Sequence, residues 1–180
     1  MLALLGGCAS DAPSGDAAPA GPDPLLRLTE EGVAGLDGTT SFSPEAVRAA
    51  LPEGFAIETG RVETTRDTIP VFYAFSDGQI ILEVYPDGQR QRVGRIDASS
   101  ELVMGPNATQ AGAGFGAMNG ADMSCEPGTD ELTGRAVCSP RGGGPFRYVF
   151  AHGADTARGE LPDRDVLAQS ILERIVWMAP

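Results

Sequence analysis

Apolar and polar residues alternate along several short stretches of this chain, and turn residues separate the stretches. Residues 71–75, 80–85 and 93–98 are rich in aromatic and β-branched side chains, a composition that favours strands. Ser76-Asp77-Gly78 and Pro86-Asp87-Gly88 stand between them and are typical of hairpin turns. Consecutive strands joined by hairpin turns predict an antiparallel meander.

Further strands are predicted on both sides of this meander. Short strands are expected within residues 25–36, and another runs from residue 55 towards Val62. In the second half, residues 123–126 and 136–138 look like paired short strands with a polar loop between them. Two more strands are expected at 146–150, where apolar residues alternate, and at 171–177.

One stretch carries clear helix signals. Ser43 is a suitable N-cap, Pro44 suits the first helical position, and Phe42 can pack on Val47 as a hydrophobic staple. Pro52 ends this helix after about two turns. A shorter helical turn is expected after Asp163, whereas the glycine-rich residues 112–116 disfavour a helix. The predicted fold class is α+β, a mostly antiparallel sheet with a few short helices.

The two halves of the chain show a weak similarity. Each runs through a turn, a helix and several strands, and Gly94-Arg95-Ile96 in the first half is echoed by Glu173-Arg174-Ile175 in the second. We therefore keep a duplicated α+β unit as a hypothesis.

The N-terminus resembles a lipoprotein signal. Leu5-Gly6-Gly7-Cys8 is similar to the lipobox of bacterial lipoproteins, and this resemblance implies that Cys8 is acylated and residues 1–7 are removed. No basic residue precedes them and the apolar run is short for a signal, so we interpret 1–7 as the remnant of a longer signal. Ala9 follows the cysteine, which implies the outer membrane and its periplasmic face.

A flexible spacer and one domain follow. Residues 9–24 consist of Ala, Pro, Gly, Ser and Asp, which cannot pack a core. The predicted organisation is therefore a signal remnant at 1–7, a lipidated cysteine and spacer at 8–24, and a single periplasmic domain at 25–180.

The charge of the chain limits its partners. The net charge is −12 and all 13 basic residues are Arg. An acidic chain without clustered basic residues is not expected to bind nucleic acid or to lie on anionic lipid by charge. The exclusive use of Arg is attributed to overall composition rather than to an anion site.

Two cysteines remain besides Cys8. Cys125 and Cys138 are expected to form a disulfide in an oxidising compartment. A metal or redox pair is the alternative. Metal binding needs more ligands than the chain's single histidine supplies, and no Cys-x-x-Cys is present.

The order of several motifs resembles a known family. Residues 28–36 open the domain, Gly94-Arg95-Ile96-Asp97 lies in its middle, Arg135-Ala136-Val137-Cys138 follows Cys125, and Ile175-Val176-Trp177 closes it. This order is similar to the RpoE-regulated lipoprotein family, a domain of unknown function in proteobacterial envelopes. The resemblance implies a lipidated envelope protein made under stress control, with a matching cysteine pair and no known reaction.

No catalytic, cofactor or metal site is predicted. His152 lacks a nucleophile motif around it and is interpreted as an exposed loop residue. The glycine-rich run at 112–116 lacks the context of a phosphate loop, and Asn107-Ala108-Thr109 is an incidental sequon. The acidic pairs lack EF-hand spacing and are interpreted as solvated surface; they are Glu30–Glu31, Asp130–Glu131 and Asp163–Asp165.

The aromatic residues allow two interpretations. They are expected to form core between the sheet and its helices rather than a ligand groove. Phe146, Tyr148 and Phe150 should share one face, while Tyr73 and Tyr85 lie on the other, which would be a partner surface if it is exposed and apolar. The predicted function is a non-catalytic, lipid-anchored interaction module with an envelope protein as partner. The alternatives are a small-ligand or lipid-binding domain and a hydrolase that would use His152.

Overall fold

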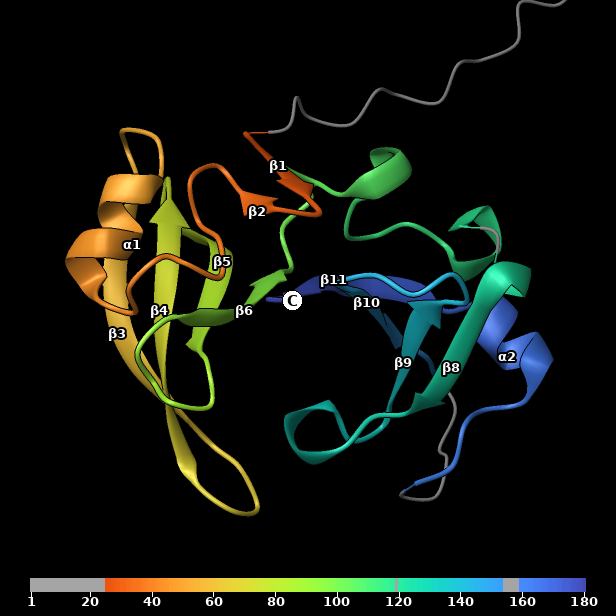
Figure 1. The fold of residues 1–180 in the computed structure, drawn as a ribbon. Coiled ribbons are helices and arrows are strands. Elements are labelled where there is room, and N and C mark those ends of the chain that lie inside the picture. Colours follow the sequence, from red (N-terminus) through yellow and green to blue (C-terminus); the bar gives the residue numbers. More distant parts are fainter. Residues whose placement is uncertain (1–24, 119, 154–158) are drawn as a thin grey trace, which may run out of the picture.

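The main feature of the protein is one strongly curled antiparallel sheet (Figure 1). The computed structural model describes residues 25–118, 120–153 and 159–180, so Cys8 and the spacer lie outside the described residues. The eight strands have the spatial order β3-β4-β5-β6-β11-β10-β9-β8. Their bounds are Ala56–Glu63 (β3), Thr68–Ser76 (β4), Gln79–Pro86 (β5), Val93–Ala98 (β6), Met123–Pro127 (β8), Arg135–Pro140 (β9), Phe146–Ala151 (β10) and Ile171–Met178 (β11).

The sheet consists of two four-stranded meanders that join through their last strands. β6 and β11 pair antiparallel, with Asp97 opposite Val176 and Ile96 opposite Trp177. Counted outward from this β6–β11 pair, each meander has its strands in reverse chain order, β6-β5-β4-β3 on one side and β11-β10-β9-β8 on the other. The helices are not placed alike, because α1 (Pro44–Ala50) precedes the first meander and α2 (Arg164–Ala168) lies between β10 and β11. A common origin of the two halves therefore stays a prediction.

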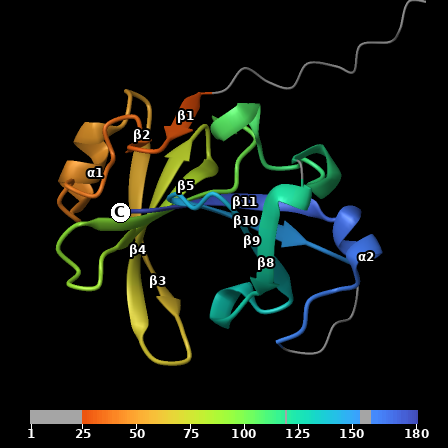
Figure 2. The same cartoon turned by 45° about the vertical axis from the view of Figure 1, so that its right-hand side comes forward.

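The sheet curls until its outermost hairpins meet (Figure 2). In the turn between β3 and β4, the Thr65 hydroxyl donates a hydrogen bond of 2.6 Å to Oδ1 of Asp130, which lies in the loop between β8 and β9. One face of the sheet is therefore concave. Arg95 of β6 belongs to that face, because its side chain also reaches this loop, at Glu131.

The hydrophobic core lies on the convex face. Phe42 stacks on Phe72 with ring centroids 4.3 Å apart, and Phe115 packs edge-on against Phe150 at 5.1 Å. The expected shared face of β10 is confirmed, since Phe146, Tyr148 and Phe150 all belong to this core. The core is covered by α1, by η2 (Phe115–Met118) and by α2, which all contribute residues to it. Two further 3₁₀ turns, η1 (Pro106–Ala108) and η3 (Gly120–Asp122), precede and follow η2 in the chain.

A small second sheet closes the core near the start of the described chain. It has the order β2-β1-β7 and contains β1 (Leu26–Thr29), β2 (Gly32–Val33) and β7 (Val103–Met104). β1 and β7 run parallel, with Leu26 opposite Val103. The indole Nε1 of Trp177 donates a hydrogen bond of 2.9 Å to the carbonyl of Glu30, so the turn after β1 is attached to the central strand of the large sheet.

The predicted first helix is confirmed with its cap. The Ser43 hydroxyl accepts a hydrogen bond of 3.2 Å from the amide of Ala46, and Val47 is buried. Such a cap satisfies one of the amides that a helix N-terminus leaves unpaired. The mostly antiparallel sheet with a few short helices agrees with the predicted α+β class.

Cys125 and Cys138 form a disulfide between neighbouring strands. They stand directly opposite each other in the β8–β9 pair. The bond closes a loop that contains η4 (Asp130–Leu132), the segment that meets the β3–β4 turn. β8 is an edge strand, so the disulfide attaches this edge to the sheet.

Replacing both cysteines by alanine is expected to lower the free energy of unfolding by about 3 kcal/mol, because the closed loop restricts the unfolded chain. Urea unfolding followed by circular dichroism would measure the loss. A reducing agent should produce a similar loss in the parent protein and none in the double variant. An equal effect of the reductant on both proteins would contradict the prediction.

Candidate functional site

The concave face carries a cluster of arginine and acidic side chains. Strand alternation places Arg95 and Asp97 on this face of β6, and register places Glu83 of β5 opposite Asp97. β11 adds Glu173 and Arg174. We name this group the Arg–carboxylate cluster; it consists of Glu83, Arg95, Asp97, Glu131, Arg135, Glu173 and Arg174.

Asp97 is the centre of the cluster and is fully buried. Arg95 donates to both of its oxygens, from Nε at 2.7 Å and from Nη2 at 2.8 Å. The remaining Nη1 of Arg95 donates to Glu131 at 3.0 Å, and its guanidinium lies over the Tyr85 ring, 4.2 Å from the centroid. A bidentate arginine–carboxylate pair stacked on an aromatic ring is fixed in both distance and plane.

A second arginine links the central strands to β9 and β5. Arg174 donates from Nη1 to Asp97 at 3.3 Å and from Nη2 to Glu173 at 3.0 Å, and its Nη1 lies 3.6 Å from Glu83. Glu173 also forms an ion pair with Arg135 of β9. The members of the cluster thus come from four strands, β5, β6, β11 and β9, and from the loop after β8. Each of its arginines forms an ion pair with at least one carboxylate.

Burial, hydrogen bonding and ion pairing hold Glu173, Tyr85 and Arg95 in their ordinary charge states. Burial by itself would raise the pKa of Glu173, but Arg135 and Arg174 lower it below its usual value. Burial, together with the hydrogen bond to Glu83, raises the pKa of Tyr85. For Arg95, burial opposes the charge while Asp97 raises its pKa. These side chains therefore keep their protonation state at neutral pH.

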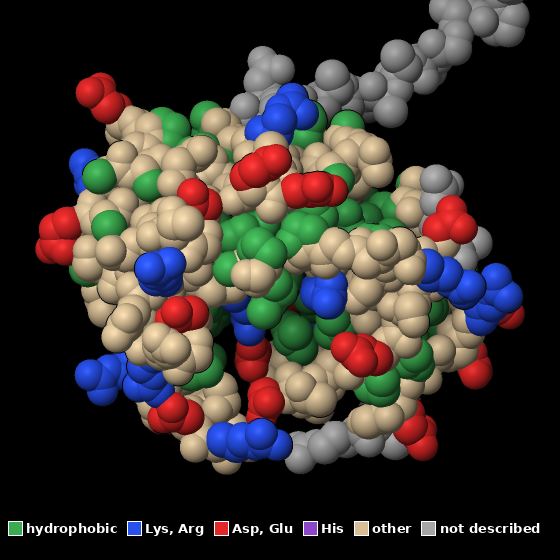
Figure 3. Space-filling view, viewed as in Figure 1, with side chains coloured by type: hydrophobic (Ala, Val, Ile, Leu, Met, Phe, Trp, Pro, Cys, Tyr) green, Lys and Arg blue, Asp and Glu red, His purple; other side chains and the backbone are tan. Residues whose placement is uncertain are grey.

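A cleft of about 690 Å³ opens at the end of the concave face, where the outer hairpins meet. Its walls are residues 63–66 of the β3–β4 turn and residues 128–131 of the loop after β8. In the lower centre of Figure 3, basic and acidic side chains border a hollow in this part of the molecule. Several polar groups of the walls bond to each other. Thr65 donates to Asp130, and Thr64 caps its own turn by accepting from the amide of Asp67.

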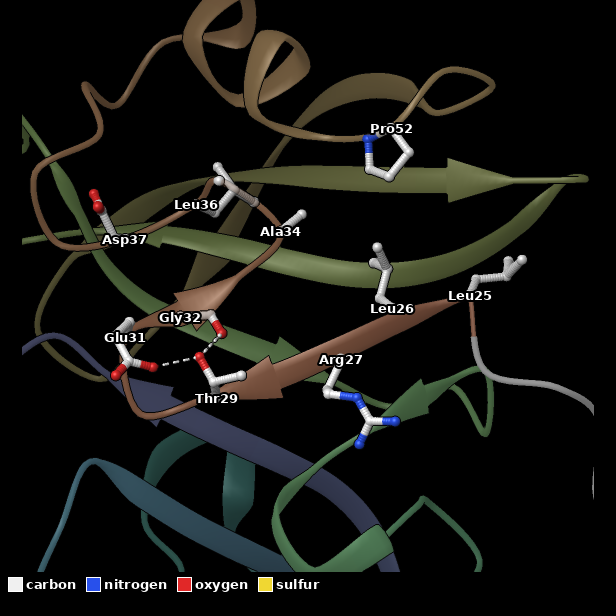
Figure 4. A pocket seen from close by; sticks show the side chains of 11 residues that line it. Leu25, Leu26, Arg27, Thr29, Glu31, Gly32, Ala34, Leu36, Asp37 and Pro52 are labelled. Carbon is white, nitrogen blue, oxygen red and sulfur yellow. Dashed lines mark hydrogen bonds between the residues drawn. The ribbon is translucent and has the colours of Figure 1, made fainter.

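A second hollow, of about 400 Å³, lies beside β1 and β2 (Figure 4). Leu25, Leu26 and Pro52 border it on one side and Glu31 on the other. The Thr29 hydroxyl donates to Glu31 at 2.8 Å and contacts the Gly32 carbonyl at 3.2 Å. This hollow adjoins Leu25, where the predicted spacer joins the domain.

Comparison with known proteins assigns the chain to a family. A family model described as protein of unknown function DUF1131 matches residues 23–179. The chain belongs to the DUF1131 family. Its fold is similar to the crystal structure of the uncharacterized protein yfeY from Escherichia coli, with a TM-score of 0.69 and 18% sequence identity. The match covers 84% of this chain and 99% of that one, and at this identity it shows the fold alone. No curated protein matches the chain.

In this DUF1131 domain, the motifs that carried the family resemblance meet in space. Arg95 and Asp97 come from the motif in the middle of the chain, and Arg135 comes from the motif around the second cysteine. These three residues belong to the Arg–carboxylate cluster, and so does Arg174, which precedes the closing motif in the sequence. This cluster was not predicted as a site from the sequence. A signal was present, because Glu83/Tyr85 and Arg95/Asp97 repeat at the two-residue spacing that places side chains on one strand face.

The environment of His152 differs from the predicted one. His152 follows β10, as expected, but it is half-buried rather than exposed, and both ring nitrogens are shielded from solvent. Among the described residues, neither nitrogen has a hydrogen-bond partner. The prediction of an exposed loop residue is therefore wrong for His152, although the neighbouring Gly153 is exposed.

The other candidate residues fall largely where the sequence placed them. Residues 112–116 form a loop and the start of a short 3₁₀ turn, and Glu30, Glu31, Asp163 and Asp165 are exposed. Asp130 and Glu131 are exposed too, but they are not merely solvated, since each bonds to another part of the sheet. Within the described residues, no three His, Cys, Asp or Glu side chains are grouped to hold a metal ion. The same residues include no helix with the length and hydropathy of a membrane span.

Tyr73 and Tyr85 lie on the concave face, opposite the core, as the alternation predicted. That face is not simply an apolar surface, because the Arg–carboxylate cluster occupies its middle and Tyr85 is buried beneath Arg95. An apolar region lies at one end of the face, where β11 ends (Figures 1 and 3).

Proposed function

We propose that this DUF1131 protein is a lipid-anchored envelope protein whose domain acts as a non-catalytic interaction module under envelope stress control. The lipobox-like Leu5-Gly6-Gly7-Cys8 and the family resemblance support an anchor at the periplasmic face of the outer membrane. The domain then binds an envelope protein near that membrane.

The observation that carries this proposal is an apolar groove at the end of β11. The groove has a volume of about 480 Å³ and is lined by Pro145, Met178, Ala179 and Pro180. Met178 is 40% exposed and stands opposite Arg95, on the concave face. An exposed apolar region with a polar rim is typical of protein contact sites.

The groove is held open by backbone hydrogen bonds. The amide of Met178 donates to the Pro145 carbonyl at 2.8 Å, and the amide of Ala179 donates to the Gly94 carbonyl at 2.9 Å. A pre-formed groove loses little conformational entropy on binding. Its rim carries one acidic and one basic side chain, Glu30 and Arg147. The complementary partner presents an apolar side chain between a basic and an acidic group.

The spacer sets how far the domain reaches. About 16 residues separate Cys8 from Leu25, and a flexible linker of that length has a root-mean-square extension of about 20–24 Å. The groove therefore samples partners close to the membrane surface. Three acyl chains of the lipoprotein type hold such an anchor stably, since single chains bind only marginally.

Photo-crosslinking in intact cells tests the proposal. A photoreactive side chain in place of Met178 is expected to capture one envelope protein in the tethered form, and none in a Cys8→Ala variant exported with a cleavable signal. Charge reversal by Glu30→Arg or Arg147→Glu should reduce that product at equal protein levels, because the rim charges orient the partner.

The same photoreactive side chain in place of Ile80 is the matched control. Ile80 is similarly exposed, at 39%, but lies at the start of β5. Equal products from both positions, or a Met178 product that survives both charge reversals, would show that the groove is not the contact.

A further inference from the structure

The strand β3 forms one edge of the large sheet, and among the described strands it pairs only with β4 (Figure 1). All eight of its residues pair with β4 without a bulge, and none of them is proline. Edge strands are ordinarily kept from pairing with other chains by short length, by proline or by a bulge. The opposite edge strand, β8, has only five residues and ends at Pro127. The outer edge of β3 therefore lacks the protection that β8 has.

Every second residue of β3 directs its backbone N–H and C=O groups away from β4. The Thr64 amide donates to the Asp67 carbonyl at 2.8 Å, so the pair beside the turn is hydrogen-bonded. Hydrogen-bonded and non-hydrogen-bonded pairs alternate along an antiparallel ladder. Arg61 accordingly stands at a non-hydrogen-bonded position, where it faces Pro70, a residue without an amide hydrogen. The outward backbone groups belong to Ile57, Thr59, Arg61 and Glu63.

The concave side of this edge presents an aromatic ring. Gly60 has no side chain, and the Tyr73 ring of β4 lies against it, because a Cβ at Gly60 would clash with Cε2 of Tyr73. Tyr73 is half-buried and packs edge-on against Phe75, with ring centroids 6.5 Å apart. Aromatic packing over a glycine of a neighbouring strand is a recognised way to fix strand register. An apolar side chain opposite Gly60 on an added strand would therefore contact the Tyr73 ring.

Three exposed charged side chains stand along the same edge. Glu58 projects on the concave side, while Arg61 and Glu63 project on the convex side. Within the described residues, none of the three has a recorded ion pair. Opposite charges directly across a strand pair are stabilising, and like charges are destabilising. The edge therefore selects a strand with basic residues opposite the two glutamates and an acidic residue opposite the arginine.

A second copy of β3 does not supply this charge pattern. In a two-fold antiparallel pair, residues that stand opposite each other share a face and differ by an even number of positions. Arg61 therefore never meets Glu58. It meets Glu63 only in a register centred on Val62, which pairs less than half of the strand. The complementary strand therefore comes from a different protein.

We propose that the outer edge of β3 binds an extended segment of another protein, which joins the sheet as an antiparallel strand. Main-chain hydrogen bonds to the outward groups supply affinity, and the side chains along the edge supply specificity. From its N-terminus opposite Glu63, the segment reads basic, apolar, acidic, apolar, β-branched, basic, apolar. The strands β4, β5 and β6 separate this edge from β11 and its groove at Met178, so the inference does not depend on the contact proposed there.

Two peptides of equal composition test the charge pattern. Acetylated and amidated Lys-Val-Glu-Phe-Thr-Lys-Val follows the expected sequence. Its isomer Glu-Val-Lys-Phe-Thr-Lys-Val places like charges opposite Glu63 and Arg61. The isomer is expected to bind the full chain about tenfold more weakly, because two cross-strand pairs become repulsive. In NMR hydrogen exchange, the first peptide should protect the four outward amides of β3 and leave the alternate amides, which already bond to β4, unchanged.

N-methylated peptides test the main-chain pairing. The amide of the peptide threonine points towards β3, opposite Thr59, whereas the amide of the peptide phenylalanine points away. A methyl group on the threonine nitrogen should therefore abolish the protection, and one on the phenylalanine nitrogen should change the affinity by less than about twofold. Equal affinities of these two peptides would overturn the proposal, and so would equal affinities of the two isomers.

One variant of the edge and one control complete the test. Thr59→Pro removes a single outward donor and should weaken the first peptide severalfold. Proline is tolerated on an edge strand, and an unchanged unfolding midpoint would show that the sheet is intact. Arg27→Glu, at an exposed position of β1, should leave the affinity unchanged. Outward amides of β3 that are already protected without peptide would also overturn the proposal, because another chain, such as a second copy, would then cover the edge.

Discussion

Replacing Asp97 with alanine is expected to lower the free energy of unfolding by about 3–5 kcal/mol. Asp97 is fully buried and receives hydrogen bonds from Arg95 and Arg174. Without it, two largely buried guanidinium groups lose their main counter-charge, and the loss is larger than the net contribution of the intact ion pairs. Urea unfolding at neutral pH, followed by circular dichroism, would measure the change.

A control variant on the same sheet shows whether the loss of stability is specific to Asp97 or follows from the removal of any carboxylate. Glu58 is exposed on β3 and has no recorded ion pair among the described residues, so Glu58→Ala should change the stability by less than about 0.5 kcal/mol. Arg95→Ala combined with Asp97→Ala should cost less than the sum of the two single variants, because the two side chains interact directly. A loss below about 1 kcal/mol for Asp97→Ala would contradict the prediction, because it would show that water readily takes the place of Asp97 beside the two arginines.

Trp177→Ala is expected to destabilise the protein by about 3–5 kcal/mol, since it removes the largest fully buried side chain from the central strand. In the sheet register, Trp177 stands between Ile96 of β6 and Phe146 of β10. It also joins the turn after β1 to the sheet through its bond to the Glu30 carbonyl. Because Trp177 is the only tryptophan, unfolding of the variant must be followed by far-ultraviolet circular dichroism.

Trp177→Phe separates the contribution of the buried ring from that of the hydrogen bond to the Glu30 carbonyl. It keeps most of the apolar area and loses the hydrogen bond, which is worth about 1 kcal/mol, together with part of the ring volume. Ile171→Ala on the same strand is the control, because Ile171 is 47% exposed. If Trp177→Ala and Ile171→Ala cost the same, Trp177 does not join the two sheets as described.

Local elements of this fold could be predicted from the sequence, and their assembly could not. The hairpin turns near Gly78 and Gly88 and the capped helix after Ser43 depend on neighbouring residues, and the structure confirms them. The pairing of β6 with β11 joins residues about 80 positions apart. Alternation fixes which face a side chain occupies but does not name the strand beside it.

The same limit explains why the Arg–carboxylate cluster was missed. Arg95, Arg135 and Arg174 are far apart in sequence, and the abundance of arginine in the chain made each one look ordinary. Only the curl of the sheet brings Glu131 to Arg95. The disulfide could be predicted because two cysteines remain once Cys8 is set aside, and their pairing needs no knowledge of the sheet order.

The position of β11 in the middle of the sheet sets the order in which the protein can be completed. A growing chain emerges from the ribosome from its N-terminus, so the first meander and the first three strands of the second are made before β11, the strand that joins the two. Until β11 arrives, β6 and β10 each present an unpaired edge, which is a template for pairing with another chain. The nascent domain therefore stays open to mispairing until β11 is synthesised, and a nonsense codon before Ile171 removes a central strand rather than an edge strand of the sheet.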